Sequence, residues 1–261
     1  MTIKAPIAAM RRKLLSSLSM RRASLGTCVP IVSFTFDDFP RTALTVGGHI
    51  LEAFGFRGTY YTSIALMDSS NHLGDQFRRA DLDTLRYRGH ELASHTFSHI
   101  SCRSVSCSKF RNDVDTGRRV IEELTGQSDS GNFAFPFGEI TLNAKRSVGL
   151  DVASSRGIWG GFNGPEVDLN LLRANSLYGG LDKRAQVQKL ILENEHRRSW
   201  LIFYSHDVRD APSRFGCTPA LLEFAVTFAL SRNARVATVA EVVAELDTHP
   251  AQQLRILTNS L

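Results

Sequence analysis

Short apolar runs that are typical of buried strands alternate with segments of helical periodicity from residue 28 onward. The strands that we predict from these runs cover residues 30–37, 57–62, 90–94, 132–136, 200–205 and 235–239. Alternating strands and helices predict a largely parallel sheet covered by helices, either an open doubly wound sheet or a barrel. In both architectures the carboxyl ends of the strands carry the chemistry.

Two helices have clear start, stop or periodicity signals. The segment 108–126 predicts an amphipathic helix that ends at Gly126. Its apolar face consists of Phe110, Val114, Gly117, Val120, Ile121 and Leu124. Thr218 followed by Pro219 is typical of a helix start, and the apolar segment 219–231 follows it. We expect both helices to pack on the core.

Length and charge limit the class of protein. The chain has 261 residues, of which 43% are hydrophobic, so it can form one domain with a large core. The first 26 residues hold six of its 31 basic residues and none of its 26 acidic residues, which leaves a formal net charge of −1 on the rest. A nearly neutral body argues against a nucleic-acid partner, because phosphate binding needs a basic face on the folded domain.

We interpret residues 1–27 as a basic, disordered leader, and we expect that deleting residues 1–26 leaves folding intact. The leader lacks an uninterrupted apolar stretch, so it is not a convincing secretory signal. A transit peptide, a weak contact with an anionic membrane surface, or a chain start at Met10 or Met20 all remain open. No segment is long and apolar enough to span a membrane. The four cysteines have neither C-x-x-C spacing nor the density of a disulfide scaffold, so we expect reduced thiols, and a bridge between Cys102 and Cys107 remains open.

Titratable side chains follow several of the predicted strands. Asp37 and Asp38 end the first one, and His206 follows the strand at 200–205. After the strand at 90–94 come His95 and His99, whose spacing corresponds to one helical turn. Two imidazoles and one carboxylate can bind a divalent metal and leave positions open for water. Taken singly, each feature also fits a bland interpretation: a turn or cap for the aspartates, and ordinary hydrogen bonding for the histidines.

Together, in this order, "TFDD", "SHTFSH", "FAFPFG" and "WLIFYSHDV" resemble the polysaccharide deacetylases, the family-4 carbohydrate esterases with a NodB homology domain. The resemblance covers roughly residues 28–246 and implies a distorted (β/α) barrel with about seven parallel strands. It implies one divalent metal ion, Zn²⁺ first, with Co²⁺ or Ni²⁺ as alternatives. The implied roles are metal ligands at Asp38, His95 and His99, a catalytic base at Asp37, a general acid at His206, and an oxyanion-binding backbone N–H at Phe137.

The sequence departs from the family pattern at three places. Ala134 stands where family members often have the arginine that orients the base, so Arg156 and Arg173 are the candidates to replace it. The segment that tunes the acid is not recognisable. Tyr204, two residues before the acid, occupies the apolar position that usually lines the acetyl pocket, and a larger, partly polar side chain there alters the pocket or its packing.

From these residues we expect a metal-dependent hydrolase, residues 28–250, that removes the N-acetyl group from an N-acetylated sugar in an oligosaccharide or glycan precursor. Residues 251–261 form a C-terminal tail. The alternatives are a catalytically impaired glycan-binding member of the fold and an amidohydrolase that acts on an amide outside carbohydrates. Without a convincing signal peptide, we expect a cytoplasmic location, with a weak contact of the leader at the inner membrane face as a further option.

Overall fold

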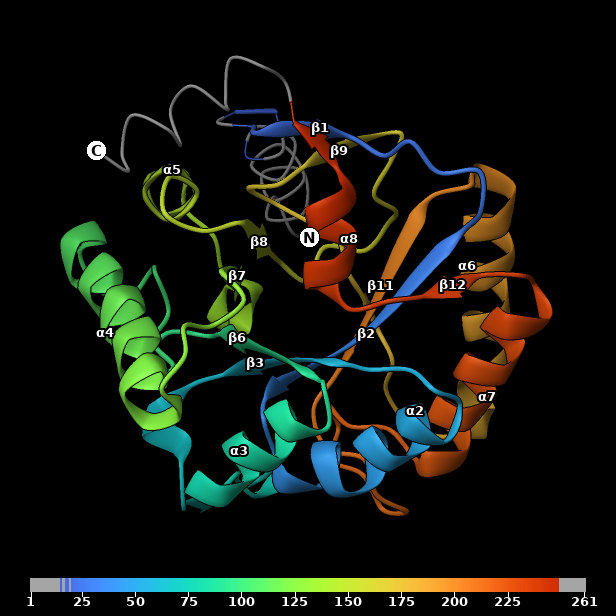
Figure 1. The fold of residues 1–261 in the computed structure, drawn as a ribbon, viewed down its shortest axis with the longest axis horizontal. Helices are drawn as coiled ribbons and strands as arrows, with labels where there is room; N and C mark the ends of the chain where they lie inside the picture. The colour runs from blue at the N-terminus through green and yellow to red at the C-terminus, as the bar shows by residue number, and fades with distance from the viewer. Residues whose placement is uncertain (1–14, 16, 19, 249–261) are drawn as a thin grey trace, which may run out of the picture.

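A twisted, curled sheet of parallel strands forms the centre of the computed structural model, which describes residues 15, 17, 18 and 20–248 (Figure 1). Seven strands lie in the order β10, β11, β2, β3, β6, β7, β8, and β12 pairs with β2. The strands are β2 (Ile31–Asp38), β3 (Thr59–Thr62), β6 (Glu91–Ser94), β7 (Asn132–Ala134), β8 (Ser154–Arg156), β10 (Asn175–Ser176), β11 (Trp200–Ser205) and β12 (Arg235–Val236). All these pairings are parallel, which confirms the predicted distorted barrel with about seven strands.

Backbone hydrogen bonds connect the two ends of this sheet. The Ser155 N–H donates to the Leu169 carbonyl, and the N–H groups of Leu172 and Gly157 continue the contact. This segment leads into β10, which pairs with β11. The six strands predicted from the sequence are present, whereas β8 (Ser-Ser-Arg) and β10 (Asn-Ser) were not predicted because they contain only polar residues.

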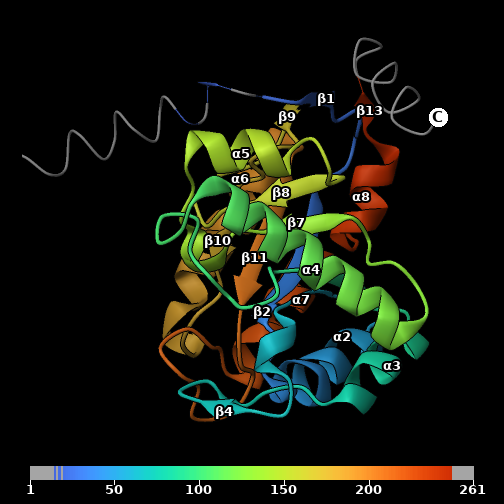
Figure 2. The ribbon, with the colours of Figure 1, turned by 90° about the vertical axis from the view of Figure 1, so that its left-hand side faces the viewer.

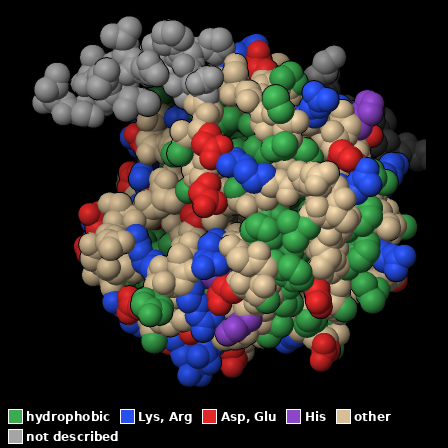
Figure 3. Space-filling model, turned by 45° about the vertical axis from the view of Figure 1, so that its right-hand side comes forward, with side chains coloured by type: hydrophobic (Ala, Val, Ile, Leu, Met, Phe, Trp, Pro, Cys, Tyr) green, Lys and Arg blue, Asp and Glu red, His purple; other side chains and the backbone are tan. Residues whose placement is uncertain are grey.

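Helices surround the sheet and close the core from outside (Figure 2). They are α2 (His49–Ala53), α3 (Arg79–Tyr87), α4 (Cys107–Thr125), α5 (Leu142–Val148), α6 (Arg184–Arg197), α7 (Pro219–Ser231) and α8 (Val239–Glu245), with a π-helical turn at Ala43–Gly48 and 3₁₀ turns at Ile64–Leu66, Pro136–Gly138 and Leu181–Lys183. Both predicted helices are confirmed. α4 buries Phe110, Val114 and Ile121 and ends at Gly126 in the left-handed conformation. The side chain of Thr218 caps α7, and α6 packs beside α7 on the face that Figure 3 brings forward.

The structure differs from the prediction of a disordered leader at residues 22–24. They form strand β1 (Arg22–Ser24), the middle strand of a small antiparallel sheet with β9 (Glu166–Asp168) and β13 (Asp247–Thr248). Ala23 is fully buried in this sheet. The expectation that residues 1–26 contribute nothing to the fold is therefore wrong for this part, since pairing with distant strands orders a segment that has no strong local signal. Residues 1–14, 16, 19 and the predicted tail 251–261 lie outside the described residues.

Two basic side chains fasten the segment before β1 to the domain. The ammonium group of the buried Lys145 on α5 contacts the carbonyls of Leu15 and Leu18, each at 2.8 Å, and Asp168 at 2.7 Å. The guanidinium group of Arg21 donates a hydrogen bond to the Gly149 carbonyl at 3.1 Å. No helix within the described ranges is long and apolar enough to cross a membrane.

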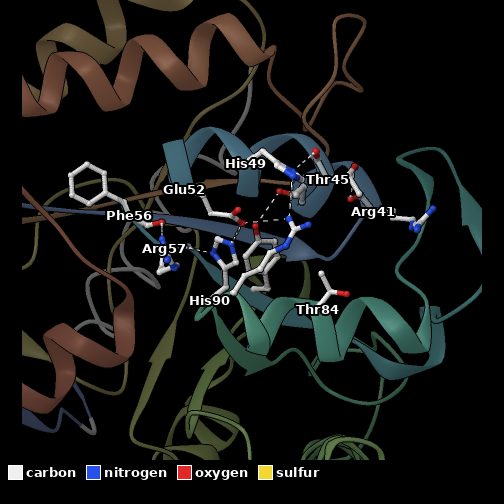
Figure 4. Close-up of polar contacts among 12 residues, drawn as sticks. Arg41, Thr45, His49, Glu52, Phe56, Arg57, Thr84 and His90 are labelled. Atoms are coloured by element: carbon white, nitrogen blue, oxygen red, sulfur yellow. Dashed lines mark hydrogen bonds and ion pairs between the residues drawn. The ribbon is translucent and has the colours of Figure 1, made fainter. Parts of the chain in front are cut away.

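The buried His90 lies directly before β6 and connects α2 with the amino ends of β3 and β6 (Figure 4). Asp38 and His95 stand at the opposite, carboxyl ends of β2 and β6. Nδ1 of His90 accepts a hydrogen bond from the Gly58 N–H at 3.0 Å, and Nε2 donates to Glu52 at 2.8 Å. Arg88 lies 3.5 Å from the same carboxylate. Burial lowers the pKa of His90 by more than the neighbouring Glu52 raises it. The neutral imidazole is therefore part of the packed base of the barrel.

Candidate active site and metal centre

Three predicted metal ligands meet at the carboxyl ends of β2 and β6. The register pairs Asp38 with Thr62 of β3, and Thr62 with Ser94, so that His95 follows directly beside them. Nε2 of His99 lies 3.0 Å from Oδ1 of Asp38, and Nε2 of His95 lies 3.4 Å from the same oxygen. The ligand atoms of the three residues all fall within 4.8 Å of one another.

Hydrogen bonding at the back of this cluster favours a bound cation. Nδ1 of His95 donates to the Ala134 carbonyl at 2.8 Å, which leaves the lone pair of Nε2 directed at Asp38 in the neutral ring. Oδ1 of Asp38 is buried and has no hydrogen-bond partner among the described residues. A divalent ion can accept the lone pairs of the two imidazoles and the carboxylate, which point at one another with no proton between them. The three residues therefore fit the metal that the sequence suggested.

The carboxylate of Asp38 is ionised in this setting. Burial by itself raises its pKa, but His95 and His99, when they carry a proton in place of a metal, donate hydrogen bonds and place positive charge beside the carboxylate, which holds the pKa well below the ordinary value. A carboxylate that stays charged is the form that binds a cation.

Backbone conformation, rather than a helical turn, brings His95 and His99 together. Asp38, Thr96 and His99 have φ values of 64°, 65° and 52°, in the left-handed region that residues with a Cβ rarely adopt. The helical spacing inferred from the sequence is wrong here, because residues 95–99 form an irregular turn after β6. α4 supports this turn: at Gly117 a Cβ would lie 2.9 Å from the backbone of Thr96 and Phe97, so only glycine allows the approach.

Asp37 is separate from the ligand cluster and has its own cation. Its carboxylate forms an ion pair with the guanidinium group of Arg156, which reaches across from β8. Both side chains are almost completely buried: 6% of the Asp37 side chain and 1% of the Arg156 side chain is exposed. Burial lowers the pKa of Arg156, but the charge of Asp37 raises it further, so the guanidinium stays protonated.

The structure separates the two arginine candidates by location. Arg156 contacts Asp37, whereas Arg173 is exposed and its Nη1 hydrogen-bonds the Gly160 carbonyl at 3.3 Å. In the sheet register Arg156 stands directly opposite Ala134. Arg156 thus comes from the strand next to the one on which the family pattern places the arginine.

Two tyrosines enclose the guanidinium of Arg156. Its central carbon lies 4.6 Å from the ring centre of Tyr61 and 5.4 Å from that of Tyr204. Tyr204 in turn makes an edge contact with Tyr178, with ring centres 5.4 Å apart. Burial raises the pKa of Tyr204. Tyr61 and Tyr178 were not identified from the sequence, and only the alternation of inward-facing positions on a strand could have pointed to Tyr61.

His206 follows β11 on the other side of β2. Ser205 pairs with Phe36, so His206 and Asp37 come next in neighbouring strands. Nδ1 of His206 donates to the Phe215 carbonyl at 3.2 Å, and no residue that the structure describes hydrogen-bonds Nε2. The Phe215 ring lies beside it at 5.6 Å. Phe215 was not identified from the sequence, because nothing local links it to a residue nine positions away.

Phe137 lies beside the ligand cluster, on the 3₁₀ turn that follows β7. Its φ of 59° and the adjacent Gly138 turn the backbone sharply, and its N–H makes no hydrogen bond within the described residues. The ring lies 4.5 Å from that of His99 and is 60% exposed. A free N–H at this edge is available to a substrate oxygen.

These features define an α/β barrel with a candidate Asp-His-His metal site and a separate, arginine-paired carboxylate at the carboxyl ends of its strands. Residues 26–153 match the polysaccharide deacetylase family model, which confirms the resemblance seen in the sequence. The chain matches no curated protein.

Solved structures of family-4 carbohydrate esterases share the fold. An acetyl xylan esterase from Clostridium thermocellum, solved with a cobalt ion, is 20% identical with a TM-score of 0.57 over 82% of this chain and 90% of its own. A peptidoglycan N-acetylglucosamine deacetylase is 14% identical with a TM-score of 0.59 over 89% and 96%. A mutant of a family pseudoenzyme is 14% identical with a TM-score of 0.53 over 83% and 68%.

Proposed function

We propose that the chain is a metal-dependent deacetylase that hydrolyses the N-acetyl group of a saccharide. The observation that carries the proposal is the pairing of Asp38 with His95 and His99, next to an independent buried carboxylate at Asp37. When bound, a divalent ion supplies polarisation of the acyl carbonyl and acidification of a water molecule. The family match and the solved deacetylases support this chemistry.

The side chains around that site divide the proton transfers between them. Asp37, held by Arg156, takes a proton from the attacking water as its oxygen bonds to the acyl carbon. The N–H of Phe137 donates to the oxygen that becomes negative. Nε2 of His206 then gives a proton to the amine nitrogen as the carbon–nitrogen bond breaks. The products are acetate and the free amino sugar.

The supporting experiment is an activity screen with reconstituted metal. We expect acetate release from N-acetylated oligosaccharides by the wild type, with Zn²⁺, Co²⁺ or Ni²⁺ added to protein stripped of metal. Asp37→Asn should retain metal and lose turnover, because an amide cannot accept the proton. His206→Ala should lower the rate by about 10²–10⁴, the usual contribution of a general acid. Asp83→Asn, on the exposed face of α3, serves as a control.

Two other functions give different results in the same screen. A catalytically impaired glycan-binding protein is favoured by Ala134 and by the pseudoenzyme among the similar structures. It would bind oligosaccharides without releasing acetate at any metal loading. An amidohydrolase on non-carbohydrate amides would turn over simple or cyclic amides and leave the N-acetylated saccharides intact. Retention of Asp37, Asp38 and His206 favours the deacetylase.

A further inference from the structure

We infer that Asp207 is a positioning residue for His206, through the loop 207–217. The inference rests on the proposed function, in which His206 is the general acid. In the described part of the chain no carboxylate hydrogen-bonds the imidazole of His206. Its Nδ1 instead donates to the Phe215 carbonyl, and the same carbonyl accepts the backbone N–H of His206 at 3.1 Å. The orientation of the acid therefore depends on where Phe215 lies.

The carboxylate of Asp207 determines the shape of this loop. Asp207 is fully buried, and it accepts hydrogen bonds from the Ser213 hydroxyl at 2.5 Å and from the Ser213 N–H at 2.8 Å. The hydroxyl of Ser213 in turn accepts the Phe215 N–H at 3.1 Å. The carboxylate, Ser213 and Phe215 thus form a continuous chain of contacts that ends at the imidazole.

Packing and backbone pairing hold the same loop closed. A Cβ at Gly216 would overlap the Asp207 carboxylate, so the loop folds tightly around it. The Cys217 N–H donates to the Asp207 carbonyl at 2.9 Å. Arg209, partly exposed, lies 2.8 Å from the carboxylate and balances its charge. These contacts leave the loop little freedom to shift.

Two rings restrict the imidazole plane. The ring centre of His206 lies 5.6 Å from that of Phe215 and 6.2 Å from that of Tyr178, and these two rings are 6.0 Å from each other, so both pack on the same side of the imidazole with their planes tilted against it. Because Nδ1 is committed to a carbonyl, Nε2 is the nitrogen that carries the proton to the leaving amine and is left with a lone pair afterwards. Displacement of the Phe215 carbonyl would turn the ring and misdirect that proton, and a shift of about 1 Å can cost about 10²-fold in rate.

The test uses Ser213→Ala, which removes one side-chain oxygen from a partly exposed position, together with Asp207→Asn. A matched control is Ser231→Ala, whose hydroxyl bonds the Phe228 carbonyl at the end of α7. Each variant is assayed with an N-acetylated oligosaccharide and with 4-nitrophenyl acetate. The ester has a good leaving group and does not need protonation by His206, whereas the amide does.

We expect Ser213→Ala and Asp207→Asn to lower kcat on the amide by about tenfold or more, with KM and ester turnover within about twofold of the wild type. His206→Ala is the reference for a loss on the amide without a loss on the ester. Ser213→Thr, which keeps the hydroxyl, should restore the amide rate. Equal losses on amide and ester would show a merely structural loop and overturn the inference. Unchanged amide rates would overturn it as well.

A second measurement does not depend on turnover. In ¹⁵N-histidine spectra, assigned with His206→Gln, we expect the wild-type ring at high pH to carry its proton on Nδ1 and Ser213→Ala to show a mixture of tautomers. A wild-type ring protonated on Nε2 would overturn the inference even in an inactive protein. Loss of activity on every substrate with the Nδ1 tautomer present would instead contradict the proposed function alone.

Discussion

Asp37 and Asp38 are neighbours in sequence with different surroundings. Successive strand residues point to opposite sides, and the left-handed φ of Asp38 turns its carboxylate further towards His95 and His99. Asp37 faces Arg156 instead. One carboxylate therefore stands among imidazole lone pairs and the other against a fixed cation, which suits a ligand and a base respectively.

We predict that the wild type binds one divalent metal per chain and that Asp38→Asn and His95→Ala each abolish it. Loss of one donor from a set of three leaves too few ligands. Elemental analysis of purified protein measures the metal content directly. Asp83→Asn is the control, and full occupancy in both ligand variants would show that the metal site is misassigned.

We predict that the buried His90 makes the free energy of unfolding depend on pH. Its folded-state pKa is below the unfolded value of about 6.5, so the unfolded chain binds the proton more strongly and the free energy of unfolding falls as pH drops below about 6.5. Denaturant titrations at pH 7.5 and 5.5 should show a smaller loss in His90→Gln than in the wild type. His196→Gln, on the exposed side of α6, should behave as the wild type. Equal losses in all three proteins would contradict the prediction.

At the scale of the elements, an arginine on β8 takes the place of the one that the family pattern puts on the neighbouring strand β7. Ala134 on β7 pairs with Arg156 on β8, and the small side chains of Ala93 and Ala134 pack together with Tyr61 beneath the guanidinium. The long side chain thus has room to cross the barrel to β2. The carboxyl ends of the strands bring Asp37, Arg156 and the candidate ligands Asp38, His95 and His99 to one edge.

We predict that Arg156→Ala lowers kcat by about 10²-fold or more, because it leaves the base unsupported. It should also cost about 3–5 kcal/mol of unfolding free energy, since Asp37 remains buried without a partner. Arg173→Ala is the matched control and should change neither quantity. Kinetics and denaturant titration check both.

The combined Ala134→Arg and Arg156→Ala exchange extends this test. The new arginine starts from the paired position, so part of the lost activity should return. Failure of the exchange in a folded protein, together with wild-type rates in Arg156→Ala, would exclude the base-positioning role.

At the scale of the whole molecule, the barrel and the small sheet of β1, β9 and β13 form one body (Figure 1). Contacts from Arg21 and Lys145 tie the start of the described chain to α5 and its following loop. Residues 20–24 are thus part of the fold.

We predict that deletion of residues 1–26 lowers Tm by several degrees, because β1 and its contacts are lost. A loss of about 2 kcal/mol shifts Tm by about 4–8 °C in a domain of this size. Deletion of residues 1–14 keeps every contact described above and is the control. Thermal unfolding that is the same in both deletions would show that β1 contributes nothing.

The sequence by itself determined six strands of the central sheet, the helices at α4 and α7, and the residues at the strand ends. Those features follow from local periodicity, capping residues and the order of the motifs, and each of these signals depends on residues that are close together in the sequence.

Only the tertiary structure decided between Arg156 and Arg173, gave His206 its Phe215 partner and ordered β1, β8 and β10. Arg156 meets Asp37 across 119 residues of chain, and β1 pairs with strands near residues 166 and 247. Such contacts depend on strand register and on the space left by small residues, and neither has a local signal in the sequence.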